Sequence, residues 1–79
     1  MNIVSKAIAA AIESEGSQVK AGRRIGVSQA AISRWMSEGR LPRTEFTGET
    51  DYSKTLAILS GVQHDKILKA SQKAWKQRR

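Results

Sequence analysis

The sequence has no cysteine and only one histidine among its 79 residues. Without thiols the chain can form neither disulfides nor thiolate metal sites, and one histidine cannot supply a zinc-binding set. No apolar run approaches the length of a membrane span. Lys6 and then Glu13 interrupt the apolar pattern near the N-terminus, where a signal peptide needs an unbroken core. We therefore expect a cytoplasmic protein that holds no metal and no cofactor.

Groups that carry out phosphoryl chemistry are missing as well. The sequence offers no histidine pair, no carboxylate cluster and no phosphate-binding loop. Glu13 and Glu15 are not a catalytic pair, because residues two apart on a helix face different directions. An enzyme, such as a small nuclease or an integrase fragment, is therefore not expected.

The net charge of +7 is divided unevenly along the chain. Residues 17–43 carry a net charge of +5 and residues 66–79 a net charge of +6, whereas residues 1–16 carry −1 and residues 44–65 carry −3. Two basic stretches separated by an acidic one favour phosphate contacts at particular surfaces over a uniform cationic coat.

The apolar periodicity predicts an all-α domain with five helices and no strand. The helices are expected over roughly residues 3–14, 18–25, 29–38 and 52–60, and from residue 64 or 65 into the tail. In the second helix, Val19, Gly22 and Ile25 are expected to face inward. Thr50 or Asp51 is the expected cap of the fourth helix.

The segment between the third and fourth helices is predicted to be a loop. Pro42 and Gly48 break helical structure there, and Leu41 and Phe46 are its only large apolar residues. We expect these two apolar side chains to pin the loop to the core.

Residues 18–37 meet the steric requirements of a helix-turn-helix. Ala21 and Gly22 are small enough to let a second helix cross closely. Gly26 stands where the first helix ends and the chain turns, and such a turn favours the positive φ that glycine adopts readily. Ser28 can cap the second helix of the motif, expected over residues 29–38, through its side-chain oxygen.

The second helix of this motif leaves a mostly polar set of side chains facing outward. They are Gln29, Ala30, Ser33, Arg34 and Ser37. Glutamine, serine and arginine bind base edges and phosphates in DNA, and the amide of Gln29 suits adenine. Arg34 can reach guanine or a phosphate, and helix geometry alone does not decide between them. An ordinary helical hairpin with a solvated polar face is the alternative.

Two arginines follow this helix, one on each side of Pro42. Arg40 and Arg43 stand where phosphates beside the groove would lie. Two solvated arginines would give the same sequence, so both interpretations stay open.

The last helix combines apolar residues with a row of lysines. Leu68 and Trp75 are seven residues apart and face one way. Trp75 either packs on its own domain or anchors a dimer interface, and we favour the interface, where tryptophan is enriched. Within an arc of about 80° on another face lie Lys66, Lys69, Lys73 and Lys76. Such a row is typical of a solvated face, and it also suits DNA backbone, RNA or an acidic partner.

The sequence resembles the small phage repressors of the Cro and CI type and their chromosomal relatives such as the YdaS-like regulators. The resemblance covers roughly residues 3–62. It is carried by the amphipathic opening helix, by GSQVKAGRRIGVSQAAISRWMSEGRLPRTEF and by the following TGETDYSKTLAI. It implies a lambda-repressor-like DNA-binding fold with the helix-turn-helix at the second and third helices. Gly22 departs from the family pattern, in which alanine is usual.

The resemblance also implies roles for individual residues. Gln29 and Ala30 would meet bases, and the other members of the base-reading set would meet bases or phosphates. That set is Ser28, Gln29, Ala30, Ser33 and Arg34. At the start of the second helix, N–H groups and the helix dipole would point at the DNA backbone. The expected phosphate contacts are Ser17, Gln18, Lys20, Ser37, Arg40 and Arg43.

Residues 1–62 are thus expected to form a DNA-binding domain, and residues 63–79 a basic helix or tail for dimerisation or partner contact. We expect a repressor of transcription in a bacterial cell or a phage-infected host. A homodimer would place two recognition helices in successive major grooves, about 34 Å apart, on a two-fold-symmetric duplex operator. The alternative is a helix-turn-helix antitoxin or interaction protein whose C-terminal helix binds a protein partner.

Overall fold

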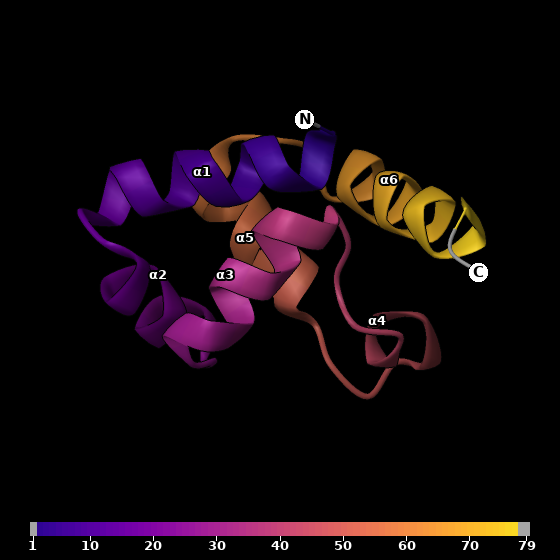
Figure 1. Ribbon diagram of the computed structural model, residues 1–79, viewed down its shortest axis with the longest axis horizontal. Helices are drawn as coiled ribbons and strands as arrows, with labels where there is room; N and C mark the ends of the chain where they lie inside the picture. The colour runs from indigo at the N-terminus through magenta and orange to yellow at the C-terminus, as the bar shows by residue number, and fades with distance from the viewer. Residues whose placement is uncertain (1, 78–79) are drawn as a thin grey trace.

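Six helices and no strand make up the described part of the chain (Figure 1). The structure is a computed structural model that describes residues 2–77. Arg78 and Arg79, which belong to the basic stretch 66–79, lie outside the described residues. The helices are α1 (Ile3–Glu15), α2 (Gln18–Ile25), α3 (Gln29–Glu38), α4 (Thr44–Thr47), α5 (Tyr52–Ser60) and α6 (His64–Gln77). The prediction of an all-α fold is confirmed.

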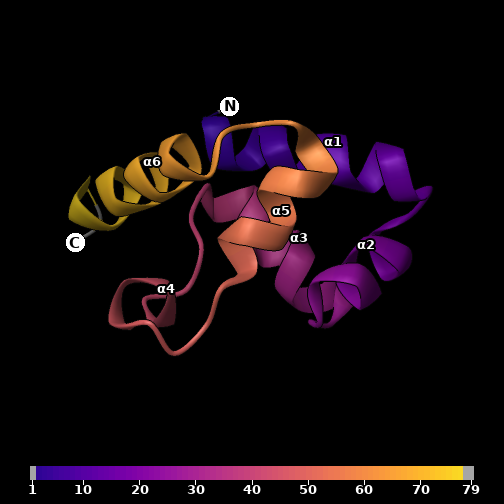
Figure 2. The same ribbon diagram turned by 180° about the vertical axis from the view of Figure 1, so that it is seen from behind.

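The short helix α4 lies in the segment that was predicted to be a loop. Gly48 ends this single turn with a φ of 83°, and its N–H donates to the carbonyl of Thr44. Four residues are too few to show a helical period, so the expected five helices become six within residues 2–77. In both views α4 and its flanking loop lie to one side of the packed helices (Figures 1 and 2).

α1 supplies a continuous apolar stripe to the core because its apolar residues recur at every fourth position with adjacent partners. This stripe packs against α3 and α5 (Figure 1). The buried core residues are Val4, Ala7, Ile8, Ala11, Ile25, Ile32, Trp35, Leu41, Leu56 and Ile67. Two polar contacts fix the start of α1 on the end of α3: Asn2 Nδ2 donates to the carbonyl of Gly39, and Ser5 Oγ donates to that of Met36, each at 2.6 Å.

α6 packs on the same core as the other long helices. Ile67 and Ser71 are fully buried, and α6 contacts both α1 and α5. It lies at the opposite end of the molecule from α2 (Figures 1 and 2). The expected boundary between residues 62 and 63 falls in the short connection from α5 to α6 and stays a prediction.

Four large apolar side chains of the described residues are exposed, namely Ile3, Val19, Phe46 and Ile58. For Val19 and Phe46 this is contrary to the expectation stated above. Val19 is 43% exposed and Phe46 is 42% exposed. The buried face of α2 includes Ala21 and Ile25, and Val19 lies about 200° around the helix from Ala21. Phe46 is carried away from the core on α4, so of the two expected side chains only Leu41, which is fully buried, packs in the core.

Candidate nucleic-acid interface

α2 and α3 form a two-helix unit whose ends are fixed by local contacts. Ser17 caps α2 by accepting from the N–H of Lys20 at 3.1 Å, and Ser28 caps α3 by accepting from the N–H of Ala31 at 3.2 Å. Gly26 ends α2 with a φ of 96°, a left-handed conformation that favours glycine. Because each signal lies next to the group that it satisfies, the sequence alone predicts these helix ends.

The turn between the two helices passes close to α2 at Gly22. The carbonyl of Gly22 accepts from the N–H of Gly26 at 2.7 Å and from that of Val27 at 2.8 Å. A Cβ atom at this position would lie 2.6 Å from the carbonyl oxygen of Val27, which is too close for a real contact. The turn therefore has no room for the alanine methyl group that the family pattern usually carries here.

One side of α3 faces solvent along its whole length. Its outward residues are Gln29, Ala30, Ser33, Arg34 and Ser37, all exposed. They fall within an arc of about 140°, and Ser28 at the head of the helix is exposed too. Ile32 and Trp35 point the other way and are buried. The residues expected to read bases thus share one exposed surface, and their role in binding stays a prediction.

The N-terminus of α2 is a second polar feature of this two-helix unit. Ser17 and Gln18 are half-buried there, and Lys20 is exposed. No acidic residue occupies the first turn of α2, so no carboxylate there offsets the partial positive charge of the helix end. Free N–H groups and a nearby lysine suit an anion.

Arg40 and Arg43 flank the same proline but differ sharply in exposure. Arg40 is only 6% exposed; its Nε lies 3.3 Å from Oε1 of Glu38, and its guanidinium carbon lies 3.8 Å from the ring centroid of Trp75. Arg43 is exposed, with its guanidinium carbon 4.4 Å from the same centroid. Both expectations for Arg40 are therefore corrected: it is not a solvated arginine, and burial and stacking keep it from meeting a phosphate.

Trp75 ties α6 to the loop that follows α3. Its Nε1–H donates to the carbonyl of Leu41 at 2.7 Å, and the N–H of Leu41 donates to Oγ of Ser71 at 2.7 Å. Side chains of α6 therefore satisfy both backbone groups of a buried loop residue. Trp75 packs on its own chain, while a dimer contact through its remaining surface and the half-buried Leu68 stays a prediction. No local pattern points to Ser71, because its partner lies 30 residues away.

Glu45 caps α5 from outside that helix, which the sequence analysis missed. Its Oε2 accepts from the N–H of Tyr52 at 2.9 Å and from the hydroxyl of Thr50, and its Oε1 accepts from the N–H of Ser53 at 3.0 Å. Asp51 occupies the N-cap position of α5, as expected, but makes no side-chain cap bond, and Glu45 accepts from the first N–H groups instead. Burial raises the pKa of the Glu45 carboxyl, but the hydrogen bonds from Thr50, Ser53 and Tyr52 outweigh burial and hold the pKa below its ordinary value.

Within residues 2–77, no group of three or more histidine, aspartate or glutamate side chains is arranged to hold a metal ion. None of the six helices has both the length and the apolar character that crossing a bilayer requires.

The chain is similar to a phage Cro protein. Over 39 residues it is 53% identical to the 8.4 kDa cro protein of Escherichia phage HK022, a stretch that covers 49% of this chain and 51% of that protein. The chain thus spans about half the length of the curated relative that it matches. No family model and no solved structure matches it. The resemblance to Cro-type regulators that the sequence indicates is confirmed.

Proposed function

We propose that this protein is a sequence-specific transcription regulator that binds double-stranded DNA. The observation that carries the proposal is the exposed polar side of α3, presented by two capped helices that a tight turn holds together. The similarity to a cro protein supports the same conclusion. The protein acts by binding in the cytoplasm of its host and catalyses no reaction.

Base reading in this proposal belongs to the head and outward face of α3, lying in the major groove in the lambda-repressor-like manner. The amide of Gln29 pairs with adenine, and the methyl group of Ala30 packs against that of thymine. Arg34 reaches guanine or a phosphate, and the hydroxyls of Ser28 and Ser33 contact base edges or the backbone. These are short or bidentate contacts, which require α3 to be held rigidly by the turn at Gly26.

Phosphate contacts surround the base-reading face. The N–H groups at the start of α2 bind one phosphate through the helix dipole. We retain every expected phosphate contact except Arg40, namely Ser17, Gln18, Lys20, Ser37 and Arg43. The stacking of Arg43 on Trp75 orients its exposed guanidinium group.

Two copies of the protein would read a two-fold-symmetric operator. Two recognition helices about 34 Å apart enter successive major grooves of one duplex face. Leu68 and Trp75 on α6 are the proposed dimer contacts. A dimer bound at a promoter represses transcription by occupying the site that the polymerase needs.

Selection of bound sequences from a random duplex pool at physiological salt tests the proposal. We expect enrichment of an inverted repeat whose half-sites lie about 10 bp apart. If no sequence is enriched while salt-sensitive binding to bulk DNA persists, the protein is a non-specific nucleic-acid binder and the proposal is wrong.

Gln29→Ala identifies the residue that reads the enriched site. The change should cost about 1–3 kcal/mol on the selected sequence and relax its specificity. Gln63→Ala removes an exposed glutamine from the connection between α5 and α6 and should leave binding unchanged, because Gln63 is not among the proposed DNA contacts. An equal loss of affinity for selected and random duplex would exclude Gln29 from base reading.

A further inference from the structure

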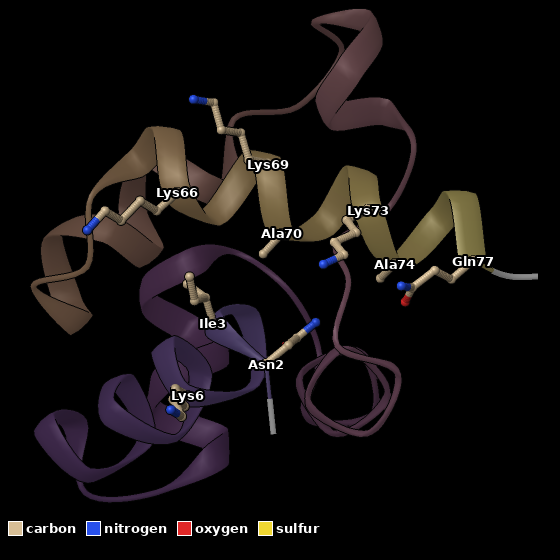
Figure 3. Close-up of a pocket in the computed structure, with 9 residues that line it drawn as sticks. All are labelled: Asn2, Ile3, Lys6, Lys66, Lys69, Ala70, Lys73, Ala74 and Gln77. Carbon is tan, nitrogen blue, oxygen red and sulfur yellow. The ribbon is translucent and has the colours of Figure 1, made fainter.

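A basic groove lies between the start of α1 and α6 (Figure 3). Its volume is about 610 Å³. Lys66, Lys69 and Lys73 of α6 line it together with Lys6 of α1. A second hollow of about 410 Å³ shares Lys6 and Lys66 and extends the groove toward the connection between α5 and α6.

The floor of this groove is apolar. Ile3, which is 38% exposed, lies on the α1 side, and Ala70 and Ala74 point from α6 toward α1 (Figure 3). Small side chains keep the floor low enough for another helix to lie in it. An apolar floor between cationic rims fits a ligand that is itself apolar on one side and anionic at its edges.

The lysines have almost no counter-charge of their own. Within residues 2–77, Lys69 pairs with Asp65 at 3.3 Å, and no carboxylate is within ion-pair distance of the other three lysines. Like charges three and four residues apart on a helix repel, as Lys66, Lys69 and Lys73 do here. Such a local cost is expected where a surface is used for binding.

Two simpler occupants of the groove are disfavoured. None of the residues proposed to contact DNA lines the groove, and it lies at the end of the molecule away from α2 (Figures 1 and 2). A two-fold dimer through this face would set one row of lysines against the same row in the partner, which repels.

We propose that this groove binds an acidic amphipathic helix of a protein partner. The apolar stripe of that helix packs on Ile3, Ala70 and Ala74, and its carboxylates pair with the lysines. Lys66 and Lys73 are about 10 Å apart along α6, so carboxylates seven residues apart on the docked helix meet both of them. The proposal is independent of how α3 reads DNA.

The test uses the full chain and a fluorescein-labelled synthetic helix of about 18 residues. In this probe glutamates seven residues apart flank a leucine stripe, and a matched probe carries glutamine in their place. Fluorescence anisotropy should show binding of the glutamate probe that weakens with salt. The glutamine probe should bind about tenfold more weakly, since it keeps only the apolar contact.

Matched charge reversals locate the contact. Lys66→Glu with Lys73→Glu should weaken the glutamate probe about tenfold. Lys54→Glu with Lys76→Glu makes the same change in net charge outside the groove and should change affinity less than about twofold. Ala74→Gln fills the floor without altering charge and should also weaken the probe. Binding of the selected duplex by the groove variants shows that they are folded.

Three results would overturn the proposal. The probe would bind the wild type and the Lys66→Glu, Lys73→Glu variant equally if the groove were not its site. Loss of bulk duplex affinity in that variant would show that DNA backbone occupies the groove. A wild-type dimer that becomes a monomer in that variant, measured by sedimentation, would show that a second copy does.

Discussion

Two regions of this molecule, the α2–α3 unit and the loop that follows α3, are stabilised by contacts of very different sequence separation. At the α2–α3 end, the caps and the turn bonds join residues no more than five apart. Beyond α3, Ser71 and Trp75 hold Leu41 across 30 and 34 residues. The unit proposed to read DNA is therefore built from local sequence, whereas the loop that carries Arg43 depends on a helix from the far end of the chain.

The largest expected loss of stability is at Trp75, which makes the long-range contact with Leu41. Trp75→Ala should lower the free energy of unfolding by about 3 kcal/mol, because the indole packing and the bond to the Leu41 carbonyl are both lost. Trp75→Phe keeps an aromatic ring and should cost about 1 kcal/mol. Urea unfolding followed by circular dichroism measures both. If neither change alters stability, the contact with Leu41 does not hold the loop.

Sedimentation of the Trp75→Ala variant tests the proposed dimer. We expect this variant to be a monomer.

The next largest loss of stability is expected at Gly22, in the α2–α3 unit that local contacts stabilise. Gly22→Ala raises helix propensity by about 1 kcal/mol, yet its methyl group would meet the Val27 carbonyl at 2.6 Å. We expect a net loss of about 2 kcal/mol in the free energy of unfolding, since backbone must move to relieve the contact. Lys20→Ala, at an exposed position of the same helix, is the control and should be close to neutral. A more stable Gly22→Ala protein would mean that the turn accommodates the methyl group.

A smaller effect is expected at Glu45, whose carboxylate caps α5. Glu45→Gln should cost about 1 kcal/mol at neutral pH, because the amide has one acceptor oxygen where the carboxylate has two. One of the N–H groups of Tyr52 and Ser53 then loses its acceptor, and the other keeps only a neutral bond. The pKa of Glu45 is lower in the folded protein than its ordinary value of 4.5. Its stabilisation is therefore fully present well above pH 4.5 and is lost as the pH falls through the folded pKa.

Unfolding of the wild type and of Glu45→Gln across this pH range measures the difference. The two proteins should approach equal stability at low pH. Glu13→Gln, at an exposed position of α1, should show no such convergence. A difference that stays constant with pH would mean that the charge of Glu45 is not what stabilises α5.

The smallest effect should distinguish the two arginines beside Pro42. Arg43→Ala should weaken binding to all duplexes and lower the salt slope of binding by about one unit, as the loss of one phosphate contact does. Arg40→Ala should leave the slope unchanged and reduce stability instead, because its side chain is buried against Trp75. Equal slopes for wild type and Arg43→Ala would remove Arg43 from the phosphate contacts.

The difference in range also explains which features could be predicted from sequence. Serine caps and Gly26 act on their immediate neighbours, so the bounds of α2 and α3 follow from local patterns, and so does the outward face of α3. Burial of Arg40 depends on Trp75, which lies 35 positions further along the chain. The residues next to Arg40 in the sequence are those expected around an exposed arginine, so they do not predict its burial.

Features that depend on a partner elsewhere in the fold were missed for the same reason. Glu45 caps a helix that starts seven residues later, across a single turn with no helical period of its own. Val19 is apolar, as core residues usually are, but the opposite face of α2 packs inward. These outcomes are set by how helices pack, which periodicity within one segment does not contain.

The amide hydrogen of Leu41 offers a direct way to watch α6 detach. It is fully buried and bonded to a hydroxyl of another helix rather than to its own backbone. Its exchange with deuterated solvent therefore requires α6 to move away, while amides inside α3 can stay protected by their own helix. The resonance of this one amide would thus report whether binding to α3 changes how firmly α6 holds the loop that follows α3.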